Sequence, residues 1–409
     1  MKRLSKCLGI LVLTMTMTIG LYSNGVNLNG NGSKAIAMGG AFVGLADDYS
    51  AVFWNPAGLT QMKEASLSFF ATNIIPKATY KLAALGIDAK SENKMYPSAG
   101  IGYFKPLSEN MVFGVYAYVP SGLGAKWNGA NLTALSGGTT YKWESFLGVF
   151  ALSPTIAVKL TEQVSFGVAL NLDYGMLKLK MPALGQYEED IKGFGFGATF
   201  GLLFKVNEAI RFGLSFKTPM KATLNGDATM SGAALFGLPT TDDAKRKVTW
   251  PMWLGAGLCF KPVDNFTLTI DAQYTNWKKL KNIPMAYTNA GWIQYFQEGS
   301  DLQLKWKDAI QWRFGLEYGL SDAVFLRAGF YTDPCVSAID THNILLPEVG
   351  YKWITFGLGY KSGNITFDLA VEYGMGKDVT VSFADAGDGM PGTFGADILV
   401  PNLAVTIRL

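Results

Sequence analysis

Residues 164–174 have the sequence VSFGVALNLDY, in which large apolar side chains alternate with small or polar ones. One face carries Val164, Phe166, Val168, Leu170, Leu172 and Tyr174, and the other carries Ser165, Gly167, Ala169, Asn171 and Asp173. A period of two with one apolar face predicts a β-strand. The same alternation recurs at 210–217, 267–277, 365–373 and 402–409. The repetition predicts an all-β fold.

The composition favours a membrane barrel over a soluble sandwich. Hydrophobic residues make up 49% of the chain and charged residues only 16%, against roughly 25% charged in typical soluble domains. After the first 25 residues there is no uninterrupted apolar run of about 18 residues, which a membrane helix requires. The polar faces are mostly Gly, Ala, Ser and Thr, whereas a soluble sandwich would expose Lys and Glu. We therefore expect a transmembrane antiparallel β-barrel whose apolar face meets lipid.

We expect fourteen strands, joined alternately by short turns and long loops. The predicted strands are 64–75, 94–105, 110–119, 143–159, 163–181, 193–206, 209–223, 246–262, 265–277, 304–319, 323–332, 350–361, 364–376 and 397–409. The long loops are expected at 120–142, 224–245, 278–303, 333–349 and 377–396. An even strand number returns both termini to the periplasmic side.

The chain before residue 64 lacks the strand pattern. Residues 1–23 form a predicted signal peptide, with a basic start, an apolar core at 8–21 and cleavage within 20–25. Residues 24–63 are rich in Gly, Asn and Ala and are either a disordered leader or a hatch folded into the lumen. We expect the hatch, because an apolar tract of this size should not remain in water. The barrel is then residues 64–409.

The hatch region carries the most specific motif, from Gly39-Gly40-Ala41 to Asn55-Pro56-Ala57-Gly58. Weaker stretches occur in order along the chain at 118–123, 152–157, 306–308 and 327–331. In their order and spacing, these residues make nearly the whole mature chain resemble the FadL/TodX family of outer-membrane transporters for hydrophobic compounds.

The resemblance implies a fourteen-stranded barrel plugged by the hatch, with passive transport of long-chain fatty acids or other hydrophobic molecules. The ligand would leave sideways into the membrane through a kink in the third strand. The implied gating residues are Asn55, Pro56, Ala57 and Gly58. Pro120 and Gly122 end the third predicted strand and are the kink candidates.

Four basic residues fall on the lumen face of predicted strands: Arg211, Lys217, Arg313 and Arg327. They could bind a fatty-acid carboxylate. The alternative is pairing with lumen carboxylates, of which the candidates are Asp173, Asp271, Glu317, Asp368 and Glu372.

Other functions have less support in the sequence. His342 is the only histidine and is expected in a solvated loop, which argues against a Ser-His-Asp enzyme. We expect no enzyme activity, no metal and no cofactor. A net charge of +3 gives no reason to expect nucleic-acid binding. The expected partners are hydrophobic small molecules and outer-membrane lipid, for a monomer in the bacterial outer membrane. Uptake of aromatic hydrocarbons by the same route, or a surface adhesin or structural barrel, remain alternatives.

Overall fold

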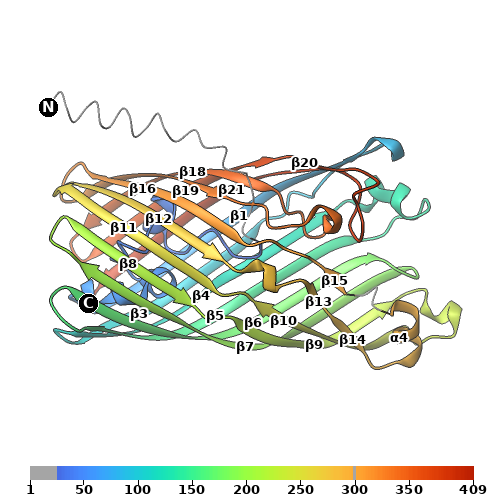
Figure 1. Cartoon of the computed structure of the whole chain (residues 1–409), viewed down its shortest axis with the longest axis horizontal. Coiled ribbons are helices and arrows are strands. Elements are labelled where there is room, and N and C mark those ends of the chain that lie inside the picture. Colours follow the sequence, from blue (N-terminus) through green and yellow to red (C-terminus); the bar gives the residue numbers. More distant parts are fainter. Residues whose placement is uncertain (1–24, 298–300) are drawn as a thin grey trace.

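The computed structural model describes residues 25–297 and 301–409 of the chain. The predicted signal peptide lies outside these residues. The described chain forms a closed antiparallel barrel of fourteen strands, which confirms the predicted fold (Figure 1). The first strand, β1 (Ser66–Leu82), pairs along its length with the last, β21 (Gly392–Arg408). This pairing closes the wall and leaves no free strand edge there.

Ten further strands of the wall are continuous. They are β3 (Tyr96–Ser108), β4 (Met111–Trp127), β5 (Trp143–Lys159), β6 (Val164–Pro182), β7 (Gln186–Lys205), β12 (Phe266–Thr275), β16 (Ala309–Gly319), β17 (Val324–Asp333), β18 (Gly350–Ser362) and β19 (Ile365–Lys377).

The remaining two wall strands are each interrupted beside a proline. β8 (Ile210–Lys217) continues as β9 (Met220–Met230) after Pro219, and β10 (Thr241–Trp250) continues as β11 (Trp253–Val263) after Pro251. Proline has no N–H to give to the strand ladder, so a break at these positions is expected. The shorter strands β2 (Ile87–Lys90), β13 (Asn282–Ile283), β14 (Met285–Tyr287), β15 (Leu302–Gln303) and β20 (Val379–Val381) lie in the loop regions.

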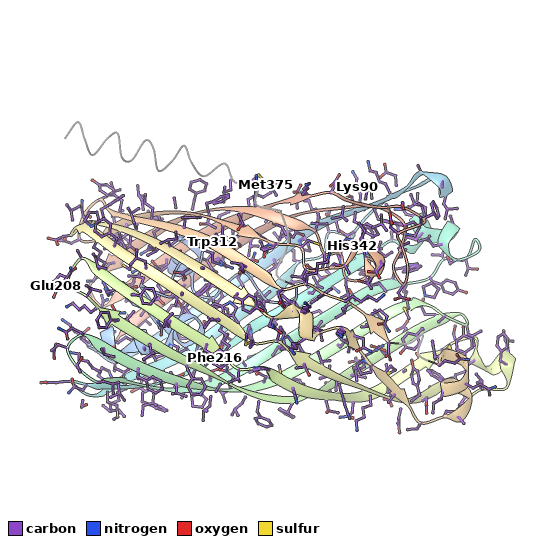
Figure 2. All side chains as sticks on the ribbon, viewed as in Figure 1. Lys90, Glu208, Phe216, Trp312, His342 and Met375 are labelled. Carbon is purple, nitrogen blue, oxygen red and sulfur yellow. The ribbon has the colours of Figure 1, made fainter. Side chains whose placement is uncertain are left out.

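Alternate residues of the wall face outward, as the period of two predicts. In β12, Leu268 is 38% exposed while its neighbour Thr269 is 5% exposed. Trp312 and Met375, which Figure 2 labels, are large apolar side chains exposed on other strands. In a bilayer such outward side chains contact lipid, and the strand ladder satisfies the backbone polar groups.

Several strands extend beyond their predicted ends. β9 and β10 remain paired from Thr223↔Lys247 to Thr229↔Thr241, so the predicted loop 224–245 shrinks to residues 231–240. β4 continues to Trp127, so the prediction that Pro120 and Gly122 end the third strand is wrong. Above the lipid, strand pairing no longer requires one wholly apolar face, so alternation alone underestimates these lengths.

The segment from residue 25 to residue 63 lies inside one end of the barrel, and we call it the hatch. It contains the helices α2 (Ser33–Ala37) and α3 (Ala51–Trp54) and the 3-10 helix η1 (Pro56–Gln61), drawn in blue within the wall in Figure 1. Its side chains form a buried apolar cluster that includes Phe42 and Trp54. Within the described chain, no helix has the length and apolar character needed to cross a membrane.

Candidate functional site

Asn55 joins the hatch to the wall. Its side chain is fully buried, and Nδ2 donates hydrogen bonds to the main-chain oxygens of Val43 at 2.8 Å and Leu202 at 2.9 Å. Its Oδ1 accepts from the N–H of Ala57 at 3.2 Å, which caps η1. One side chain therefore bonds to the hatch twice and to β7 once.

The residues after Asn55 fit tightly into the lumen. Pro56 is the first residue of η1, where its missing N–H costs no helical hydrogen bond. A Cβ at Gly58 would stand 2.0 Å from the oxygen of Ala46, and one at Gly201 of the wall would stand 2.1 Å from Asn55 Oδ1. Gly58 is required because two segments of the hatch meet there, and Gly201 is required because the hatch meets the wall there.

Polar groups of the wall also hold the hatch at residues 37–43. Asp271 Oδ2 accepts hydrogen bonds from the N–H groups of Phe42 at 2.8 Å and Val43 at 2.9 Å. Thr355 Oγ1 donates to the oxygen of Ala37 at 2.8 Å. From the sequence, Asp271 was expected only as a partner of a lumen cation. Its position on an inward face was the available signal, but the identity of its partner depends on the folded hatch.

Two of the predicted carboxylate-binding residues contact the hatch instead. Arg313 donates from Nη1 to the oxygen of Gly39 at 3.0 Å, and its guanidinium lies 4.2 Å from the ring centre of Tyr331. Arg211 donates to Oε1 of Gln61 in η1. Both cations are thus engaged with groups of the protein.

Arg327 belongs to a charged network at the hatch. It donates to Glu317 and to Asp368, each at 2.6 Å. Lys34 of the hatch lies 2.8 Å from Asp47 and 3.6 Å from Glu317. For Arg327 the geometry agrees with the alternative of pairing with lumen carboxylates, and the network links hatch and wall.

Lys217 has a different environment. Its Nζ lies 3.4 Å from the ring centre of Phe53 and 4.7 Å from that of Trp253. In the described part of the chain it forms no ion pair with a carboxylate. It lines a cavity of about 90 Å³ above the hatch, together with Arg313 and Asp173. Of the four predicted residues, Lys217 alone has no side-chain hydrogen bond or ion pair within the described part of the chain.

The wall is incomplete between β3 and β4. The two strands pair from Ser108↔Met111 to Ile101↔Ala117. Beyond that point, residues 96–100 of β3 pair with β1 but not with β4 in the described structure. The ladder is therefore open at 96–100 on one side and at 118–122 on the other.

Pro120 and Gly122 lie at this opening. The pairing of β4 with β5 shifts register at 118–121, which marks a bulge. Here the start of the hatch takes the place of β3. The N–H of Leu28 donates to the oxygen of Pro120 at 3.1 Å, and the N–H of Gly122 donates to the oxygen of Val26 at 2.9 Å.

A cavity of about 340 Å³ passes through the opening. Its lining includes the outward-facing Pro97 and Phe150 and the inward-facing Trp353 and Glu372. Residues 27–29 line both this cavity and the cavity at Lys217. This cavity therefore has lining residues on both the lumen face and the outer face of the wall.

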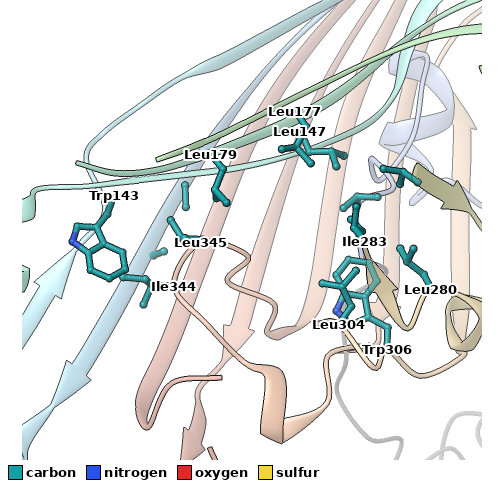
Figure 3. Close-up of a cluster of buried hydrophobic side chains, with 14 of the residues drawn as sticks. Trp143, Leu147, Leu177, Leu179, Leu280, Ile283, Leu304, Trp306, Ile344 and Leu345 are labelled. Carbon is teal, nitrogen blue, oxygen red and sulfur yellow. The ribbon is translucent and has the colours of Figure 1, made fainter. Parts of the chain in front are cut away.

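A third and larger cavity of about 700 Å³ lies nearer the long loops, and we call it the mouth cavity. Figure 3 shows apolar side chains that line it, among them Trp143, Leu177, Ile283, Trp306 and Leu345. They come from two wall strands and from loops far apart in the sequence. A pocket of this size and character suits a hydrophobic small molecule.

His342 was expected in solvent, and that prediction is wrong. It is 1% exposed, and its ring packs edge-on against Phe394 with ring centres 4.6 Å apart. The loop that carries it packs against the wall strands instead of extending into water, and Trp127 Nε1 donates to the oxygen of Ile344 at 2.8 Å. Among the residues described, no group of three or more His, Cys, Asp or Glu side chains is placed to hold a metal ion.

The family model described as "Outer membrane protein transport protein (OMPP1/FadL/TodX)" matches residues 9–406. The chain is 22% identical to the long-chain fatty acid transport protein of Salmonella typhi, with 88% of this chain and 89% of that protein covered. A Pseudomonas aeruginosa FadL homologue has a similar fold, with a TM-score of 0.79, 14% identity and coverage of 94% of this chain and 100% of that one. The Pseudomonas putida toluene transporter TodX also has a similar fold, with a TM-score of 0.72, 18% identity and coverage of 94% and 99%.

The family match spans nearly the whole chain, and the two matched structures share the barrel fold of this protein. The members of this family are transport channels of the outer membrane. The chain belongs to the OMPP1/FadL/TodX family of outer-membrane proteins that transport hydrophobic molecules.

Proposed function

We propose that this barrel carries long-chain fatty acids passively and releases them sideways into the membrane between β3 and β4. The observation that carries the proposal is the cavity of about 340 Å³ lined by both inward-facing and outward-facing residues of the wall. Lateral exit from a barrel requires a gap in the hydrogen bonds between neighbouring strands, and such a gap lies between β3 and β4 at residues 96–100.

The route consists of two apolar cavities, and the second of them adjoins the small cavity at Lys217 through residues 27–29. The ligand first enters the cavity of about 700 Å³ among the loops and then the cavity at the wall opening. Each methylene group removed from water contributes about 0.8 kcal/mol, so the chain of a fatty acid favours both sites over solution. No step requires the alkyl chain to cross the polar outer layer as a free solute.

Lys217 supplies the preference for an acid. An ammonium group held between aromatic rings, without a paired carboxylate in the described structure, is suited to a fatty-acid carboxylate. An aromatic hydrocarbon has no charged group for this lysine. Aromatic hydrocarbons remain the second candidate, because a toluene transporter has a similar fold.

Uptake of radiolabelled oleate and of toluene distinguishes the two ligands. The protein would be expressed in cells that lack their own transporter, alongside the variant Lys217→Met. We expect oleate uptake to rise on expression and to fall several-fold in the variant, with toluene entry unchanged. Absence of oleate uptake with the unaltered protein would reject the fatty-acid proposal. If the variant takes up as much oleate as the unaltered protein, only the role of Lys217 is rejected, and the fatty-acid proposal stands.

A further inference from the structure

A basic depression lies at the end of β12 and the start of β16. It has a volume of about 530 Å³ and is lined by Lys278, Lys281, Lys305, Trp306, Lys307 and Asp308. All four lysines are exposed, whereas Trp306 is buried. The depression is separate from the lumen cavities that the transport route uses, although Trp306 also lines the mouth cavity.

The depression opens on the lipid side of the wall. Tyr274 points outward, between the buried, inward-facing Gln273 and Thr275. Its hydroxyl donates to Asp308 Oδ2 at 2.9 Å, and the N–H of Lys278 donates to Asp308 Oδ1 at 2.9 Å. Asp308 therefore places the lysines directly beyond an outward-facing tyrosine, and tyrosine is enriched at membrane–water interfaces.

The height of the depression matches the outer boundary of the bilayer. β12 has 10 residues and β16 has 11, and a membrane-crossing strand needs about 9–11. The lysines at 278–281 follow the end of β12 within a few residues, and those at 305–307 precede the start of β16. In Figure 1 the wall at β12 ends well short of the extended strands β9 and β10. The lysines consequently lie where lipid headgroups begin.

The depression has an excess of positive charge. Lys305 pairs with Asp340 at 2.8 Å and Asp388 at 2.9 Å. Lys278, Lys281 and Lys307 form no ion pair within the described part of the chain, and Asp308 is the one acid among the six lining residues. An anionic group at the membrane surface would balance the charge of these three lysines.

We propose that this depression binds the phosphate groups of a lipid of the outer leaflet. Lysine binds phosphate as a compact point charge with rotatable donors. Juxtamembrane lysines attract anionic headgroups over a short range. Trp306 separates the depression from the mouth cavity, so a lipid held here also braces one wall of that cavity.

Binding of diphosphorylated lipid A to the purified full-length barrel tests the proposal, with native mass spectrometry as the readout. The patch variant is K278Q/K281Q/K307Q. The matched control is K63Q/K105Q/K361Q, which removes the same charge from exposed lysines near the short-turn end. We expect the patch variant to bind lipid A about tenfold more weakly and the control to bind like the unaltered protein.

Three further measurements make the result decisive. The same lipid without phosphates should bind equally weakly to all three proteins, and oleate should bind equally well to all three. The affinity of the unaltered protein for lipid A should fall as sodium chloride rises, a result that needs no variant to fold. Equal lipid A binding by patch and control variants, or no salt dependence, would overturn the proposal. Selective loss of oleate binding in the patch variant would also overturn it, since the depression would then receive the ligand.

Discussion

Asn55 donates a hydrogen bond to the main-chain oxygen of Leu202, 2.9 Å away, and so joins the hatch to the inner wall of β7. The same Nδ2 donates to the oxygen of Val43 within the hatch. Both acceptors are backbone carbonyl groups that have little access to water in the filled lumen. The position of the hatch therefore depends on the side chain that begins the Asn55-Pro56-Ala57-Gly58 motif.

Replacing Asn55 with Ala should loosen the hatch without unfolding the barrel. Loss of the amide leaves two buried carbonyl groups without this donor, at a cost of about 1–3 kcal/mol. Hydrogen exchange over residues 42–62 should accelerate at least about tenfold, and oleate uptake should fall at unchanged barrel abundance. Asn110→Ala, in an exposed turn, is the matched control. Unchanged exchange in the hatch would show that Asn55 does not hold it.

A methyl group at Gly213 should displace the hatch. Its Cβ would stand 2.0 Å from the oxygen of Val43, whereas a Cβ at Gly197 has its nearest neighbour at 3.4 Å. Gly213→Ala should therefore cost about 1–3 kcal/mol through forced movement of the hatch, and Gly197→Ala much less. Hydrogen exchange over the hatch and urea unfolding would measure both. Similar behaviour of the two variants would contradict the close approach of hatch and wall.

A disulfide between residues 27 and 121 should block lateral release. Asn27 and Ser121 form an antiparallel bridge, for which Cα atoms lie about 4.5–5.5 Å apart, within the range for a disulfide. Asn27→Cys with Ser121→Cys should lower oleate uptake when oxidised and recover it after reduction. Asn27→Cys alone controls for the substitution. If oxidation leaves uptake unchanged, the start of the hatch need not leave β4 during transport.

Acid should loosen the loop that carries His342. Burial lowers the pKa of His342 to about 4 from its ordinary value of 6.5. The folded loop thus favours the neutral ring. The stability of the folded loop is therefore fully present above pH 6.5, and part of it is lost as the pH falls toward 4. The loss approaches about 3 kcal/mol, at 1.36 kcal/mol for each pKa unit.

Proteolysis of residues 334–349 between pH 7.5 and 4.5 measures this effect. We expect faster cleavage at the lower pH, with the pH dependence much reduced in His342→Gln. A protease active across the range and an unfolded substrate peptide would correct for changes in the protease itself. Equal pH dependence in the two proteins would assign the effect to another group.

Alternation along the chain was enough to predict the barrel. Residues 164–174 predict a strand, and the structure places β6 at Val164–Pro182. β5 begins and ends at its predicted residues, 143 and 159. A lipid-facing strand must present an apolar side chain at every second position, so it can be recognised from a short run of consecutive residues. Strand ends above the membrane are not constrained in this way, which explains the errors at β4, β9 and β10.

The sequence by itself therefore determined the barrel, its strand number and the presence of a separate N-terminal segment, because each depends on neighbours along the chain. Only the tertiary structure decided what that segment contacts. Leu202 is 147 residues from Asn55, and Asp271 is 229 from Phe42. The opening between β3 and β4 likewise follows only from comparing two strand pairings, that of β3 with β1 and that of β3 with β4. Contacts between distant residues arise from closing the wall around the hatch, and no local pattern specifies them.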